Sequence, residues 1–130
     1  MHTTLKLKAT LGAVTFLAAG AFVFQSVAAD GKDVIEEVMK TYHKAPKGTD
    51  PTCKRAADGK ATPEELKKLV IAYKSMAKTK APKGDQASWK EKTATLLSAA
   101  EAMQKGAPDG IARYKQAVDC KACHSVHKPD

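Results

Sequence analysis

The sequence has few aromatic side chains, only three cysteines and no long strand-like alternation of apolar and polar residues. The missing alternation argues against a β-sheet and predicts an all-α fold. Aromatic residues make up 5% of the 130 residues, with a single Trp, and much of the apolar content is alanine. A chain of this length forms one domain with a modest core. We therefore expect a small helical domain whose centre needs a further group to fill it.

The sequence also lacks an apolar run of full membrane-spanning length, and no cysteine stands directly after its apolar N-terminal run. It begins MHTTLKLK, with Lys6 and Lys8 but no acid, and residues 9–24 carry no charge. A helix needs about 20 apolar residues to cross a bilayer. A basic start, a shorter apolar middle and the small-residue exit QSVAAD are typical of a secretory signal peptide; an uncleaved anchor is the alternative. We predict that residues 1–29 are cleaved and that the mature chain is periplasmic, without stable membrane insertion or a lipoprotein anchor.

No block of five or six basic residues stands alone, although the net charge is +8. Cleavage would remove Lys6 and Lys8 and leave a net charge of +6. A basic chain can bind nucleic acid, but an exported chain rarely meets any, so we expect no nucleic-acid partner. The scattered lysines serve either solubility or the steering of acidic protein partners toward the chain.

Four stretches of helical periodicity follow the predicted signal peptide. They begin near residues 32, 62, 85 and 108, and the last leads into the C-terminal cysteines. The second opens on TPEE, in which Thr62 and Glu65 form a capping-box pattern, and Asp85 is a candidate cap for the third. Because most connections are short, consecutive helices should be antiparallel neighbours. Residues 30–130 are therefore predicted to form an antiparallel four-helix bundle.

Two cysteines and a histidine stand near the end of the chain in the stretch CKACH, residues 120–124. A zinc site is one interpretation, with ligands drawn from Cys120, Cys123, His124 and His127. These four lie too close along one helix to converge on a small ion without breaking it, and no second CxxC pair exists. A redox disulfide is another interpretation, but a thioredoxin-like CxxC belongs to a strand-and-helix setting that this chain lacks. Three cysteines also cannot all pair within one chain.

The third interpretation uses every residue of the signature, because CxxCH is the attachment motif for c-type haem. On a helix, Cys120 and Cys123 fall on one face, so both thiols can reach the two vinyl groups at one edge of a porphyrin. His124 follows at once, and its neutral imidazole can bind the iron from the proximal side while its other nitrogen finds an acceptor. We predict one covalent haem c, held by Cys120 and Cys123, with His124 as the axial iron ligand.

On these residues the chain resembles the class II c-type cytochromes, the family of cytochrome c′ and its low-spin relatives. CKACH matches the family's signature, Lys128 matches a basic residue just beyond it, and the likeness covers about residues 32–128. The resemblance implies a four-helix bundle with the haem attached on the last helix. It also implies that two copies can pair through their first two helices as a homodimer.

The family's first helix faces the distal side of the haem, and low-spin members carry a methionine there within VMK. Residues 38–40 are Val-Met-Lys in this chain, so the resemblance implies Met39 as the distal iron ligand. The family's arginine one turn earlier, near a haem propionate, is replaced here by Ile35, so another residue must take that role. His43, one turn after Met39, is the alternative ligand, although its place among lysines at the helix end favours exposure to solvent.

The sixth ligand separates two functions. His/Met ligation raises the potential of the iron and suits the transfer of single electrons between redox partner proteins, here partners with acidic docking surfaces. An open sixth position would instead leave five-coordinate iron that binds NO or CO, as in cytochrome c′. We expect the electron carrier and no enzyme activity, since no distal His and Arg pair of a peroxidase is recognisable.

Three more side chains carry expectations about their surroundings. Cys53 lies in the long polar connection 45–61 and is expected to be a partly exposed thiol without a catalytic role. His127, close to the C-terminus, is expected to be exposed. Tyr73 is expected to pack its ring in the core with its hydroxyl toward water or a haem propionate.

Overall fold

The described part of the chain is built from helices. The computed structural model describes residues 31–130, and the predicted signal peptide, residues 1–29, lies outside the described residues. Six helices and no strand occur within residues 31–130: α1 (Gly31–Tyr42), α2 (Thr52–Ala57), α3 (Pro63–Ala77), α4 (Gln86–Gln104), α5 (Gly110–Ala117) and α6 (Cys120–His127). The prediction of an all-α fold is confirmed. None of these helices is both long and apolar enough to cross a bilayer.

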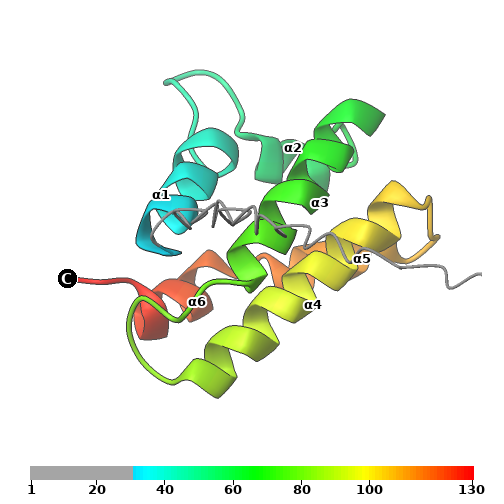
Figure 1. The fold of residues 1–130 in the computed structure, drawn as a ribbon. Coiled ribbons are helices and arrows are strands. Elements are labelled where there is room, and N and C mark those ends of the chain that lie inside the picture. The colour runs from blue at the N-terminus through cyan, green and yellow to red at the C-terminus, as the bar shows by residue number, and fades with distance from the viewer. Residues whose placement is uncertain (1–30) are drawn as a thin grey trace, which may run out of the picture.

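The helices pack as a bundle around α3 and α4. These two long helices lie side by side, run in opposite directions and are joined by the turn of residues 78–85 (Figure 1). α5 packs on α4, α1 packs on α3, and the short α2 contacts both α3 and α5. The antiparallel arrangement of α3 and α4 follows from their short connection, as the sequence predicted.

The connection between the first two predicted helices contains an additional helix, α2. Lys54 sits at its centre and its Nζ pairs with a carboxylate one turn before and one turn after it, Asp50 at 3.2 Å and Asp58 at 2.7 Å. Such pairs at a spacing of four residues stabilise a helix only slightly. A six-residue helix therefore depends on its packing against α3 and α5.

The last predicted helix is divided into α5 and α6. Val118 leaves the helical backbone conformation, with φ −82° and ψ 42°. Asp119 then accepts a hydrogen bond from the N–H of Ala122 at 2.9 Å and begins α6. An aspartate at this position stabilises a new helix start better than a continuing helix. The prediction of four helices is therefore wrong at two places, and the described residues form six.

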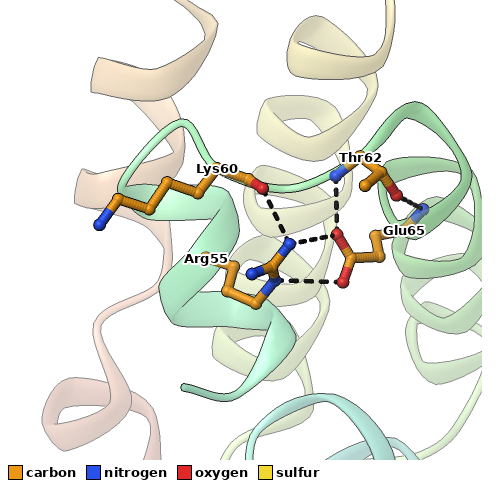
Figure 2. Close-up of polar contacts among 4 residues, drawn as sticks. All are labelled: Arg55, Lys60, Thr62 and Glu65. Carbon is orange, nitrogen blue, oxygen red and sulfur yellow. Dashed lines mark hydrogen bonds and ion pairs between the residues drawn. The ribbon is translucent and has the colours of Figure 1, made fainter. Parts of the chain in front are cut away.

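Arg55 and Glu65 tie α2 to the first turn of α3 (Figure 2). The Glu65 carboxylate accepts a hydrogen bond from the Thr62 N–H at 2.7 Å, and the Glu65 N–H donates to the Thr62 hydroxyl at 3.2 Å. The predicted capping box is therefore confirmed. Arg55 meets the same carboxylate with Nε and Nη2, each at 3.1 Å, and also donates to the carbonyl of Lys60 at 3.0 Å. The Arg55 side chain is the first cause of the lowered pKa of Glu65. One carboxylate therefore both begins α3 and holds the preceding loop.

The core contains few large side chains. Tyr73, Tyr114, Leu69 and His127 are the largest that are fully buried, and Trp89 is 2% exposed. Alanines fill much of the remaining interior; the buried ones are Ala56, Ala72, Ala99, Ala100 and Ala102. Small side chains let helices approach closely but each removes little apolar surface from water. The stability of the bundle is therefore concentrated in a few large side chains.

Candidate functional site

α6 carries the CxxCH signature on a single helix. The Asp119 cap begins this helix one residue before Cys120, so both cysteines and His124 lie on regular helical backbone. Cys120 and His124 are exposed, whereas Cys123 is half-buried and packs against the core. Neither thiol is in a disulfide, and burial raises the pKa of the Cys123 thiol. The three predicted attachment residues are therefore brought together at the surface of the bundle, one turn of helix apart.

A chain of hydrogen bonds runs through the core toward the end of α1. The hydroxyl oxygens of Tyr73 on α3 and Tyr114 on α5 lie 2.7 Å apart, and the Tyr73 oxygen lies 3.0 Å from Nε2 of His43. Both tyrosines are fully buried, with 0% exposure. Burial is the first cause that raises the pKa of each tyrosine hydroxyl. The Tyr73 hydroxyl is therefore directed at His43 and Tyr114 rather than at water, the first of the two partners that were expected.

The direction of these hydrogen bonds follows from counting hydrogens. If Tyr114 donates to Tyr73 and Tyr73 donates to Nε2 of His43, both hydroxyl hydrogens are used within the chain of three groups. The reverse direction leaves the Tyr114 hydrogen without an acceptor among the three groups, which is costly for a buried hydroxyl. We infer that Nε2 of His43 is an acceptor and that its Nδ1 carries the hydrogen.

The imidazole of His43 is sensitive to the charge of His124. The pKa of His43 is lowered from 6.5 to about 4, first by burial and then by the charge of His124. The two imidazoles are therefore within range of each other's charge, although 81 residues separate them in the sequence. The expectation that His43 is solvent-exposed at the helix end is wrong, since it is partly buried and bonded to Tyr73.

The neutral state of His43 makes the folding stability of the chain depend on pH. Since its folded pKa of about 4 lies below the unfolded value of 6.5, the unfolded chain binds this proton more readily. The folded state is therefore most stable above pH 6.5, where His43 is neutral in both states, and it loses stability as the pH falls toward about 4. We expect a loss of roughly 2–3 kcal/mol in unfolding free energy across this window.

Urea unfolding of the parent and of His43→Gln at several pH values between 7 and 4 measures this loss. The glutamine cannot titrate but still offers a hydrogen-bond partner to Tyr73. The difference in stability between the two proteins should therefore shrink or change sign as the solution becomes acidic. A difference that stays constant with pH would contradict the assignment.

Met39, the predicted distal ligand, lies on α1 one turn before His43. It is partly buried and packs against the core cluster, as does Ile35 one turn earlier. α1 places this stripe against α3, which also carries Tyr73. Met39 on α1 and His43 just after this helix are therefore one helical turn apart.

Cys53 is buried rather than partly exposed, with an exposure of 9%. It lies on α2, and the packing of that helix against α3 and α5 covers the thiol. Burial raises the pKa of Cys53, and the negative charge that Cys120 can carry raises it further. The sequence expectation for Cys53 is wrong because the helix that buries it was not predicted.

His127 is also buried, at 1% exposure, although the sequence suggested a solvent-exposed residue. Its ring accepts or donates hydrogen bonds at both nitrogens, to the carbonyl of Lys83 and to the hydroxyl of Ser88. His127 is four residues after Cys123 and therefore shares its helix face, but the partial burial of that face is known only from the structure.

Within residues 31–130, no three or more His, Cys, Asp or Glu side chains gather in a group that could hold a metal ion by themselves. Comparison of the chain with models of known protein families, with curated proteins and with solved structures finds no match. The site must therefore be interpreted from its own residues: an all-α protein whose C-terminal helix carries Cys120, Cys123 and His124.

Proposed function

We propose that this protein is an exported monohaem c-type cytochrome that carries single electrons between partner proteins. The observation that carries the proposal is the surface of α6, where two unpaired thiols and an imidazole stand within five consecutive residues. The donor set fits a haem: two thiols one turn apart for covalent attachment, and a histidine directly after them for the iron. A thioredoxin-like function would need a strand-and-helix setting, and residues 31–130 contain no strand.

Each residue of the signature has a separate role in this proposal. Cys120 and Cys123 would each form a bond from sulfur to a vinyl carbon, and the hydrogen of each thiol would pass to the neighbouring carbon. His124 would supply the proximal imidazole nitrogen. A bound haem supplies an iron centre that changes its oxidation state by one electron. The exposure of Cys120 and His124 leaves this face accessible both for attachment and for a redox partner.

The hydrogen-bond chain favours Met39 over His43 as the distal ligand. Nε2 of His43 already accepts from the Tyr73 hydroxyl, and ligation through that nitrogen would leave one buried hydroxyl of the tyrosine pair without an acceptor. Ligation by Met39 would break no such hydrogen bond, because its thioether sulfur is only a weak acceptor. We therefore propose that His124 and Met39 would hold the iron, a combination that would raise its potential and suit an electron carrier.

The visible spectrum of the reduced, exported protein tests this function. We expect a low-spin spectrum with sharp α and β bands, which Met39→Leu should convert to a high-spin spectrum while the fold is retained, because leucine has a similar volume. Met76→Leu is the matched control, since Met76 is a buried methionine of α3 and should leave the bands unchanged. His43→Gln should also keep them.

One outcome would overturn the electron-carrier proposal, and a second would change only its distal ligand. A parent protein that is already high-spin and binds CO promptly would be a gas-binding cytochrome c′ with an open distal site. Bands that disappear in His43→Gln and persist in Met39→Leu would transfer the distal role to His43.

We also propose that the protein works in the periplasm with acidic redox partner proteins. The predicted signal peptide directs it to the periplasm, and the mature chain keeps its excess of lysines. Lys121 and Lys128 are exposed on and just after α6, next to the proposed haem face. Positive charge at this place would steer redox proteins with acidic docking surfaces toward it.

A further inference from the structure

The C-terminal end of α6 is fixed to the rest of the bundle by one side chain. His127 is the buried residue of this helix, and its Nδ1 lies 2.8 Å from the carbonyl oxygen of Lys83. Because a carbonyl only accepts, Nδ1 carries the hydrogen, and in the neutral ring Nε2 then accepts from the Ser88 hydroxyl at 3.1 Å. The ring also meets the indole of Trp89 edge-on, at 5.3 Å between centroids. We call this arrangement of His127, Lys83, Ser88 and Trp89 the α6 dock.

The loop before α4 is shaped for close contact with this dock. Gly84 adopts a φ of +78°, and a Cβ added there would lie 2.7 Å from the carbonyl oxygen of Val126 and 3.4 Å from Nδ1 of His127. Any other L-residue would be strained in that conformation and would push against the backbone of α6. The side chain of Lys83 adds an exposed ion pair to Asp130 at 2.7 Å. Two adjacent residues of the loop therefore meet the last turn of α6.

The dock determines which way the signature faces. His127 lies three residues after His124 and four after Cys123, so its position fixes the rotation of the whole eight-residue helix. With His127 buried, Cys123 turns toward the core, while Cys120 and His124 remain at the surface. A rotation of one residue would move each of these groups by about 100° around the helix.

We infer that His127 is a positioning residue, which sets the rotation of α6 and so the placement of both thiols and of His124 before any haem is attached. The use of this placement, which is to present the thiols and His124 to a haem, rests on the proposed function. The dock itself belongs to the polypeptide and can be tested without haem.

The three cysteines provide the test, because they differ in exposure within one molecule. Pulsed alkylation of the reduced, haem-free mature chain, read out by peptide mass mapping, should modify Cys120 fast, Cys123 more slowly and Cys53 slowest. His127→Leu should speed Cys123 by about tenfold, the factor that corresponds to losing roughly one good hydrogen bond. Cys53 should keep its rate, since it is buried on α2. Ser125→Ala is the matched control, because the Ser125 side chain is exposed on α6 and bonds to Ala122 within that helix, and it should change neither rate.

A conservative variant separates positioning from simple filling of space. In His127→Asn the side-chain amide can still donate to the Lys83 carbonyl, so Cys123 should react at a rate closer to the parent's than in His127→Leu. Equal acceleration in both variants, or none in either, would overturn the inference. If His127→Leu exposes Cys53 as well and is therefore unfolded, Ser88→Ala decides. Removing its one hydrogen bond should speed Cys123 alone, and an unchanged Cys123 rate would overturn the inference.

The haem-loaded protein gives an independent readout. In His127→Leu we expect the haem to remain covalently attached while the NMR shifts of its methyl groups change, because their spread reports the orientation of the axial imidazole. His127→Asn should restore a spread close to the parent's. Unchanged shifts in a folded, loaded His127→Leu protein would contradict the inference. A parent chain that never acquires haem would overturn the proposed function. The positioning role of His127 would then be tested by the alkylation rates alone.

Discussion

Replacing Trp89 with alanine is expected to cost about 3–5 kcal/mol of unfolding free energy, the range measured for large aromatic side chains in cores. Trp89 is 2% exposed, its Nε1–H donates to the carbonyl of Thr79 at 3.1 Å, and its ring packs against His127. One side chain therefore joins α4 to the loop after α3 and to α6. A small domain has only about 5–15 kcal/mol in total, so the variant should be near the limit of folding.

Urea unfolding followed by circular dichroism measures this cost, because the variant lacks the only tryptophan that fluorescence could report. Ile71→Ala is the matched control. Ile71 is 56% exposed on α3, and its truncation should change the stability by no more than about 0.5 kcal/mol. A loss below about 1 kcal/mol for Trp89→Ala would contradict the view that a few large side chains hold this alanine-rich core together.

Replacing Cys120 and Cys123 together with alanine is expected to abolish covalent haem completely. The two sulfurs are the only cysteine side chains on α6, and the remaining Cys53 is buried on a different helix. Each single variant should retain one thioether at most and should accumulate less haem than the parent. The chain without both thiols could still bind haem reversibly through His124, so attachment must be measured after denaturation.

Haem staining of denaturing gels, with the intact mass of each variant, distinguishes the covalent group from a dissociable one. Cys53→Ala is the control and should carry the same haem as the parent. Haem that survives denaturation in the double variant would mean that another residue forms the bond, and loss of haem in Cys53→Ala would assign that cysteine a role not proposed here.

The helices whose signals are local could be predicted from the sequence. Thr62 and Glu65 form a capping box within four residues, and Asp85 accepts the N–H of Ser88 at 2.7 Å as the cap of α4. Such signals need no knowledge of the rest of the fold. The same holds for Cys120, Cys123 and His124, because their spacing of three and four residues predicts that they lie within about one turn of the same helix.

The elements that were missed depend on contacts between distant parts of the chain. α2 has no side-chain cap at Pro51 and is six residues long, too short for a periodic pattern to reveal. The break before α6 could have been suspected from Asp119, a good cap in an apparently continuous helix. Nothing near His43 in the sequence indicates its partner Tyr73 on α3, or Tyr114 on α5, which bonds Tyr73 in turn.

Histidines near helix ends and chain termini illustrate the same limit. The sequence places His43 among lysines and His127 near the last residue, and both positions suggest exposure. The fold instead covers both rings and supplies each with hydrogen-bond partners from other segments. Burial of a polar ring is decided by whether such partners meet it, and this is a property of the tertiary structure.

The intact mass and visible spectrum of the full-length chain, after export from a host that matures c-type cytochromes, test the central proposal most directly. We expect a coloured protein of residues 30–130 whose mass exceeds that of the polypeptide by one haem, with the haem retained after denaturation. A colourless mature protein at the mass of the bare chain, from a host shown to load another c-type cytochrome, would contradict it.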